Sequence, residues 1–143
     1  LMWLPQRPGV ANVGILDFQD AMTGPWAYDV VSLLQDARLD VAPDLEAHLF
    51  EHYCTAAASA EPGFDRDAFA FAYAALGAQR NTKILGIFAR LARRDGKTQY
   101  LRHIPRIWGY LARDLRHPGL AGLAAWYDQY MPAADRARSL LTA

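Results

Sequence analysis

The sequence predicts a mainly α-helical single domain that begins with a short β-hairpin and continues with about six helices. Its 143 residues match the size of one domain, and 52% of them are hydrophobic, which is enough to form a core. The chain contains 26 alanines and few β-branched residues, a composition that favours helix over sheet. Apolar residues also recur at the spacing of a helix face in most of the chain.

Two short apolar runs near the N-terminus predict the hairpin. Residues 1–4 and 13–16 are largely apolar, and they flank residues 5–9, a segment with two prolines and a glycine that is typical of a turn. A lone two-stranded hairpin is only marginally stable in water. We therefore expect these strands to lie against a larger body, part of which precedes Leu1.

Prolines mark the beginning of the next two helices. Pro25 suits the first turn of a helix over residues 26–38. Its inner face is predicted from the apolar spacing at Val30, Leu33, Leu34 and Ala37. Pro43 begins a second helix that runs to about residue 59, where a Glu-Pro-Gly sequence ends it. The single cysteine, Cys54, is expected to pack on the inner side of this second helix.

A long third helix is predicted from Asp65 or Asp67, either of which can cap its N-terminus, to Gly96. Its clearest apolar stripe consists of Ile84, Ile87, Phe88 and Leu91. Further along, a short helix over residues 98–103 is expected to be interrupted at Pro105, after which an apolar stripe continues over residues 104–115. A break at residues 117–119 precedes two short helices, over residues 120–130 and 133–141.

The net charge of zero conceals an asymmetry between the two halves of the chain. Residues 1–62 carry nine acidic and two basic side chains, a net charge of −7, and residues 63–143 carry the balancing +7. These halves either face each other in the fold or form a metal-binding acidic end and an anion-binding basic end. On the third helix, basic residues gather opposite the apolar stripe, a pattern that is typical of a solvated face. These residues are Lys83, Arg90, Arg94 and Lys97. Arg80 falls at the edge of the stripe, where it is expected to point into a cleft.

Asp17 is the strongest candidate for a metal ligand. It directly follows the apolar run of residues 13–16, so its carboxylate is expected at the rim of the core, where a cation bridging phosphate oxygens needs a ligand. Asp20 is three residues further on and can reach the same region, and Asp29 lies in the first turn of the next helix. Aspartate after a strand is also common in turns, so these residues by themselves leave both interpretations open.

The longer string over residues 13–38, VGILDFQDAMTGPWAYDVVSLLQDAR, resembles the metal-site segment of the aminoglycoside phosphotransferase-like kinases. Its form is most similar to the branch of bacterial cell-wall sugar kinases that phosphorylate the anomeric hydroxyl of N-acetylmuramate and N-acetylglucosamine. The string QRNTKILGIF at residues 79–88 also resembles that branch. The resemblance implies that residues 1–143 form a single helical lobe, the C-terminal lobe of a protein-kinase-like fold.

The resemblance also implies roles for particular residues. Asp17 would bind Mg²⁺ on the phosphates of the substrate ATP, with Asp20 as a second acidic residue near the metal. Gly24 and Pro25 match the loop that sets the following turn, and Asp29 matches a buried aspartate that braces the catalytic loop. Arg80 and Asn81 are candidates for binding the sugar, and the guanidinium of Arg80 suits the lactyl carboxylate of N-acetylmuramate.

No residue of this chain matches the catalytic loop of the family, H-x-D-x-x-x-x-N, which is expected upstream of Leu1. The nucleotide-covering N-terminal lobe with its phosphate-contacting lysine is also absent, and the sequence contains no G-x-x-x-x-G-K-[ST] loop. We therefore expect the chain to be inactive alone, to partner a missing N-terminal lobe, and to self-associate through its uncovered apolar side chains. The lone cysteine and the lack of a signal peptide favour the cytoplasm, with no membrane partner.

The sequence leaves several alternative functions open. Choline, an aminoglycoside and homoserine are also open as the kinase acceptor, and a non-catalytic, degenerate kinase lobe used for protein contact belongs to a different class. The string HLFEH at residues 48–52 matches that of inverted zinc peptidases, but two exposed helix histidines are the commoner origin of such a match. Nucleic-acid binding is not expected, because the chain has no net basic charge.

Overall fold

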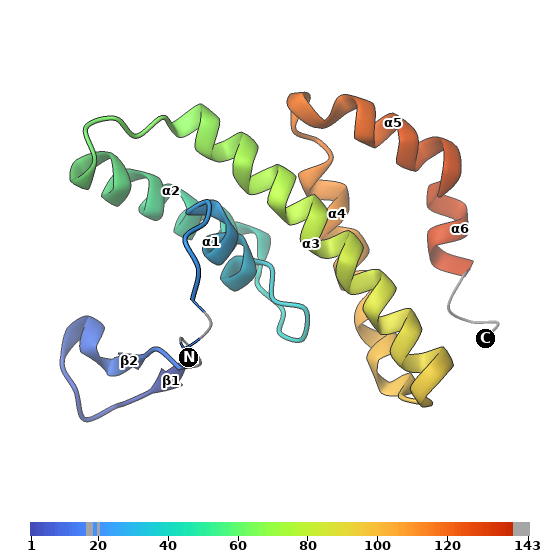
Figure 1. Cartoon of the computed structure of the whole chain (residues 1–143), viewed down its shortest axis with the longest axis horizontal. Helices are drawn as coiled ribbons and strands as arrows, with labels where there is room; N and C mark the ends of the chain where they lie inside the picture. The colour runs from blue at the N-terminus through green and yellow to red at the C-terminus, as the bar shows by residue number, and fades with distance from the viewer. Residues whose placement is uncertain (17–18, 20, 139–143) are drawn as a thin grey trace.

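The computed structural model describes residues 1–16, 19 and 21–138. Within them it confirms the mainly helical class, with a two-stranded antiparallel sheet followed by six α-helices (Figure 1). The elements are β1 (Met2–Trp3), β2 (Val13–Gly14), α1 (Ala27–Leu34), α2 (Pro43–Ala60), α3 (Arg66–Asp95), α4 (Ile104–Asp114), α5 (Ala121–Tyr130) and α6 (Ala133–Arg138). Three 3₁₀ helices lie between them, at Gly9–Asn12, Thr98–His103 and Pro118–Leu120.

The predicted hairpin is present but shorter than its apolar runs. Met2 pairs with Gly14 and Trp3 with Val13, and a 3₁₀ turn leads into β2. The hairpin lies to one side of the helices (Figure 1), and its apolar side chains stay in contact with solvent: Trp3 is 65% exposed and Ile15 70%. This exposed apolar surface is what a strand pair would show if further protein normally covered it.

The inner face of α1 agrees with the prediction in part. Leu34 is buried as predicted, and Val30 and Ala37 are partly buried against the core. Leu33, also expected to face the core, is 57% exposed, and Ala27 and Val31 are buried instead. The helix ends at Leu34, four residues before the predicted end. Gln35 caps it, and the Asp36 side chain accepts hydrogen bonds from the backbone of the turn that follows. The apolar spacing missed part of this face because the next position after Ala27 and Val31 is the polar residue Gln35, whose amide is buried.

Helix α3 is the central element of the fold and runs across the whole helical body (Figure 1). Asp65 is its N-cap, since its side chain accepts hydrogen bonds from the backbone N–H groups of Asp67 and Ala68. The C-terminal end is confirmed at Gly96, which adopts the left-handed conformation with φ 66°. Each of the three groups of buried apolar side chains includes residues of α3.

The predicted interruption at Pro105 is wrong. Pro105 lies in the first turn of α4, where its missing N–H group has no helical partner to lose. The segment before it is a 3₁₀ helix rather than an α-helix, which gives the chain its change of direction. The apolar stripe predicted beyond Pro105 is confirmed, with Ile104, Ile107 and Leu111 buried against α3.

Candidate functional site

Three of the N-terminal candidate residues, Gly24, Pro25 and Asp29, lie in the loop that leads into α1 or in its first turn. Asp17 and Asp20 lie outside the described residues, so their metal role stays a prediction. Gly24 and Pro25 form an exposed loop, and the carbonyl of Pro25 accepts a hydrogen bond from the backbone N–H of Tyr28 at 3.0 Å. Asp29 is in the first turn of α1, as predicted, but it is exposed, whereas the resemblance implied a buried aspartate.

The structure offers no support for the zinc interpretation of residues 48–52. Both histidines lie on α2, with His48 and His52 exposed to solvent, and Glu51 forms an ion pair with Arg66 of α3. Among the described residues, no group of three or more histidine, cysteine, aspartate or glutamate side chains is placed to hold a metal ion. The cysteine prediction is confirmed, since Cys54 is buried on the inner side of α2.

Arg80 and Asn81 meet the C-terminal end of α1. The Nη1 of Arg80 donates a hydrogen bond to the backbone carbonyl of Gln35 at 2.9 Å, and the side chain is half-buried. Asn81 is fully buried, and its Nδ2 donates to Gln35 Oε1 at 2.7 Å. Arg80 and Asn81 therefore contact the C-terminal end of the helix that carries Asp29 in its first turn. At a rise of about 1.5 Å per residue, Gln35 and Asp29 are roughly 9 Å apart along the helix axis. The other basic residues predicted on the outer face of α3 are exposed, which confirms a solvated face.

Gln35 is the centre of a buried polar network that connects four helices. Its side chain is 1% exposed. The Nε2 group donates to Glu46 Oε1 of α2 at 3.0 Å and to Asp114 Oδ1 of α4 at 2.8 Å. Asn81 of α3 closes the ring by donating to Asp114 Oδ2 at 3.0 Å. Such a network stabilises one arrangement of the helices, because a different arrangement leaves buried polar groups without partners.

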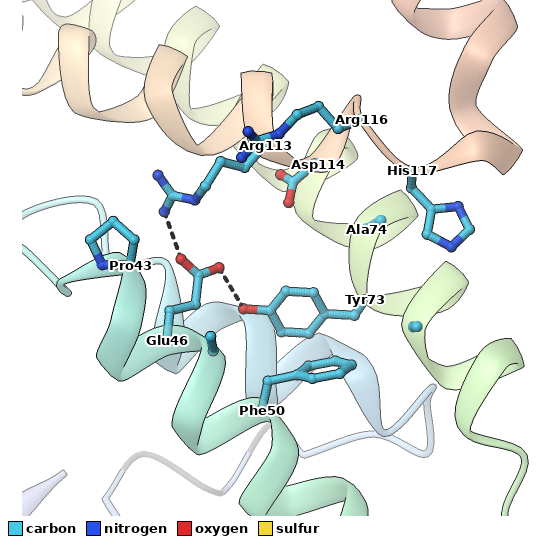
Figure 2. A pocket seen from close by; sticks show the side chains of 11 residues that line it. Pro43, Glu46, Phe50, Tyr73, Ala74, Arg113, Asp114, Arg116 and His117 are labelled. Atoms are coloured by element: carbon cyan, nitrogen blue, oxygen red, sulfur yellow. Dashed lines mark hydrogen bonds and ion pairs between the residues drawn. The ribbon is translucent and has the colours of Figure 1, made fainter.

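Glu46 extends this network toward the surface. Its Oε1 also accepts a hydrogen bond from the Tyr73 hydroxyl at 3.0 Å, and its Oε2 pairs with the Arg113 guanidinium at 2.6 Å. Figure 2 shows the Glu46 carboxylate between these two side chains, with Phe50 on the same side as the ring of Tyr73. The Arg113 guanidinium also lies 4.8 Å from the centre of the Tyr110 ring, a cation–π contact that helps to hold it.

Burial perturbs the titratable groups of the network. Loss of solvation raises the pKa of Asp114 to about 7, although the hydrogen bonds from Gln35 and Asn81 favour the ionised carboxylate. Burial also raises the pKa of the Tyr73 hydroxyl, and the neighbouring Glu46 carboxylate adds to that shift. Asp114 is thus a carboxyl group that gains or loses its proton near neutral pH.

A pocket of about 400 Å³ opens beside the network (Figure 2). Its lining includes Glu46, Tyr73 and Asp114 together with the apolar side chain of Phe50. Glu46 and Tyr73 are bonded to each other, and Asp114 is bonded to Gln35 and Asn81, so the surface that the pocket offers to a ligand is largely apolar.

Gly77 is required where α3 meets this network. A Cβ atom at this position would lie 2.7 Å from Asp114 Oδ2 and 2.8 Å from Asp114 Cγ. Because Gln35 and Asn81 hold that carboxyl in place, we expect Gly77→Ala to lower the free energy of unfolding by about 1–3 kcal/mol.

Gly86 provides the matched control for that substitution on the same helix. A Cβ atom at Gly86 would meet nothing within 4 Å beyond the backbone of its own helix. Gly86→Ala should therefore raise the free energy of unfolding by about 0.5–1 kcal/mol through helix propensity. Urea unfolding of the two variants measures both effects. Equal stabilities would contradict the close approach of Asp114 to α3.

The residues of the network were not predicted from the sequence, apart from Asn81. Gln35, Glu46 and Asp114 are polar, and a polar side chain on an amphipathic helix is ordinarily assigned to the solvent face. One signal was present: Gln35 lies four residues after Val31 and eight after Ala27, so it shares their helix face. The spacing locates this amide on the inner face, but it does not identify its partners on three other helices.

Comparison with known proteins finds a family and several relatives for this sequence. Residues 1–71 match the phosphotransferase enzyme family. Over 95% of its length the chain is 49% identical to an N-acetylmuramate/N-acetylglucosamine kinase of Caulobacter vibrioides. It is 43% identical over 87% of its length to a kinase of the same name from Neisseria meningitidis, and 40% identical over 78% to one from Pseudomonas putida. The chain spans 36%, 37% and 34% of the lengths of these three relatives, respectively.

The chain belongs to the phosphotransferase enzyme family, as its N-terminal string predicted. Within that family it is homologous to the C-terminal portion of the N-acetylmuramate/N-acetylglucosamine kinases, of which it covers about a third. No described helix is both long enough and apolar enough to cross a membrane.

Proposed function

We propose that residues 1–143 are the C-terminal lobe of a longer, ATP- and Mg²⁺-dependent kinase that phosphorylates N-acetylmuramate and N-acetylglucosamine. The observation that carries this proposal is the 49% identity to the Caulobacter kinase over nearly the whole chain. The string around Asp17, which resembles a kinase metal site, lies within the matched residues and supports the metal-dependent part of the proposal. ATP would serve as the phosphoryl donor, and the cytoplasm is where we expect the reaction to take place.

Asp17 and Asp20 are the residues that we propose for the metal. Carboxylate oxygens are the donors that Mg²⁺ prefers, so the chemistry of this pair suits the ion. When bound, Mg²⁺ supplies charge that neutralises the phosphates during transfer. Gly24 and Pro25 would fix the loop between these aspartates and α1. Asp29 would accept hydrogen bonds from the catalytic loop, and its exposure leaves its carboxylate accessible to such a partner.

Arg80 and Asn81 are the residues that we propose on the sugar side. One N–H group of Arg80 binds the carbonyl of Gln35, which orients the guanidinium. The remaining N–H groups would pair with the lactyl carboxylate of N-acetylmuramate, a group that N-acetylglucosamine lacks. Asn81 is fully buried and bonded to Gln35 and Asp114, so we assign it to support of this region rather than to direct contact.

The lobe would depend on a larger protein. The aspartate that takes the proton from the sugar hydroxyl, and the lobe that covers the nucleotide, would both lie upstream of Leu1. The exposed apolar side chains of the hairpin, Trp3 and Ile15 among them, would meet that part of the protein. In its absence, we expect self-association of residues 1–143 through the same side chains.

An acceptor panel tests the proposed function. The complete protein is assayed with ATP, Mg²⁺ and each of N-acetylmuramate, N-acetylglucosamine, choline, an aminoglycoside and homoserine, and residues 1–143 are assayed in parallel. We expect turnover with the two amino sugars and none from residues 1–143 alone. In Arg80→Gln, kcat/KM should fall at least about tenfold more for N-acetylmuramate than for N-acetylglucosamine, because only the former loses a charged partner.

Preference for another acceptor would redirect the proposal to that acceptor. Absence of turnover with every acceptor, in a protein shown to be folded, would instead favour a non-catalytic interaction module.

A further inference from the structure

Helix α1 joins the proposed metal segment to the rest of the lobe. It begins two residues after Pro25 and carries Asp29 in its first turn, and it has only eight residues. Its buried apolar side chains, Ala27, Val31 and Leu34, pack against α2 and α3. Packing of this kind is non-directional, so by itself it leaves a short helix free to shift along or rotate about its axis.

The C-terminal end of α1 carries the directional contacts. The backbone carbonyl of Gln35 accepts a hydrogen bond from Arg80, and its side-chain oxygen accepts one from Asn81. Its side-chain nitrogen donates to two carboxyl groups, Glu46 and Asp114, on two further helices. One residue thus binds α1 to α2, α3 and α4 through four hydrogen bonds, all between 2.7 and 3.0 Å.

No other amino acid reproduces this set of contacts. The oxygen must accept from Asn81 while the nitrogen donates to two carboxyl groups, and only an amide offers both at the end of a side chain of this length. A glutamate would place a third carboxyl beside Glu46 and Asp114, and a methionine of similar length would form none of these side-chain bonds. The carboxyl groups themselves are held from other directions, Glu46 by Tyr73 and Arg113, and Asp114 by Asn81.

We propose that Gln35 is a positioning residue, which fixes α1, and with it Asp29, against the helical body. The expected effect on turnover rests on the proposed kinase function, whereas the positioning of α1 by Gln35 does not depend on it. Phosphoryl transfer depends on positioning, and a displacement of about 1 Å can reduce a rate roughly 10²-fold. Gln35 acts through α1 and touches no reacting group, so its loss should affect turnover rather than the affinity for ATP.

The first experiment is amide hydrogen exchange on the complete protein, followed in α1 and α4, with Gln35→Met and the control Tyr73→Phe. The control removes one buried hydrogen bond from the same network, that from Tyr73 to Glu46, and leaves the contacts of Gln35 intact. In Gln35→Met we expect exchange in α1 to accelerate at least about tenfold more than exchange in α4. In Tyr73→Phe, α1 and α4 should change by similar factors. Equal acceleration of both helices in Gln35→Met would overturn the proposal, because it would indicate general destabilisation.

The second experiment measures kcat and KM in the complete kinase, at a temperature where melting curves show every variant to be folded. We expect kcat of Gln35→Met to fall about 10- to 100-fold with KM for ATP changed less than about threefold, and kcat of Tyr73→Phe to fall less than about threefold. An unchanged kcat beside accelerated exchange in α1 would overturn the catalytic part of the inference. Absence of turnover in the unmodified kinase would refute the proposed function instead, and the exchange result would still decide whether Gln35 fixes α1.

Discussion

Asp17→Asn in the complete kinase is expected to lower kcat roughly 10²- to 10³-fold, which is the scale of losing one group that stabilises charge in a transition state. The asparagine keeps the size of the side chain but removes the negative charge and one of the two anionic oxygens that suit Mg²⁺. Because the substitution is nearly isosteric, the melting temperature should change little. Steady-state kinetics with N-acetylglucosamine, repeated over a range of Mg²⁺ concentrations, measure the effect.

The matched control is Asp44→Asn in the first turn of α2, an exposed aspartate on another helix. It removes the same charge from the acidic half of the chain, so a loss of kcat caused by net charge alone would appear in both variants. We expect Asp44→Asn to keep kcat within about twofold of the unmodified kinase, since surface substitutions of this kind have small effects. Near-normal turnover in a folded Asp17→Asn variant would refute the metal role.

Asp114 is expected to make the stability of the 143-residue chain fall as the pH rises from about 4 to 7. Burial raises its pKa from 3.8 to about 7 in the folded state, so over this range the folded chain holds a proton that the unfolded chain has released. Below about pH 4 both states are protonated and the group costs nothing. Above about pH 7 both are ionised, and the cost of burying the carboxylate reaches its full value of about 4 kcal/mol, at about 1.36 kcal/mol per pH unit.

Asp114→Asn isolates this contribution, since asparagine does not titrate. Hydrogen bonds from arginines lower the carboxyl pKa of Asp40 and Asp95, which changes the stability in the opposite direction. The quantity to measure is therefore the difference between the variant and the unmodified chain. Between about pH 5 and pH 7.5, urea unfolding should show the free energy of unfolding of the unmodified chain falling by about 2.5 kcal/mol relative to that of Asp114→Asn. A constant difference over that range, or a carboxyl chemical shift of Asp114 that titrates below about pH 5, would contradict the raised pKa.

The predictions for Asp17 and Asp114 concern two parts of the lobe, one found from the sequence and the other from the structure. The Asp17 segment is continuous in sequence, so its chemistry can be inferred from the order of residues along the chain. The network around Asp114 joins residues that are far apart in the sequence. Gln35 and Asp114, which share a hydrogen bond, are separated by 79 positions. No pattern along the chain relates these two positions.

The predicted boundaries of several helices were close to the observed ones because local chemistry determines them. Pro43 begins α2, Asp65 caps α3, and Gly96 ends it. Each of these residues acts through its own backbone conformation or through hydrogen bonds to backbone groups within a few residues. The effect of Pro105 was wrongly predicted, because a proline interrupts a helix when it lies in the interior but is tolerated in the first turn, where Pro105 lies.

By itself, the sequence therefore determined the helical class, the ends of several helices, and the string that places this chain among the phosphotransferases. Those features depend on composition, helical spacing and short-range hydrogen bonds, all of which are present in the chain before it folds. The pairing of Glu46 with Arg113 and the burial of Asp114 were decided only by the tertiary structure. Buried polar groups are stable only when distant residues satisfy their hydrogen bonds, and the fold alone brings those residues together.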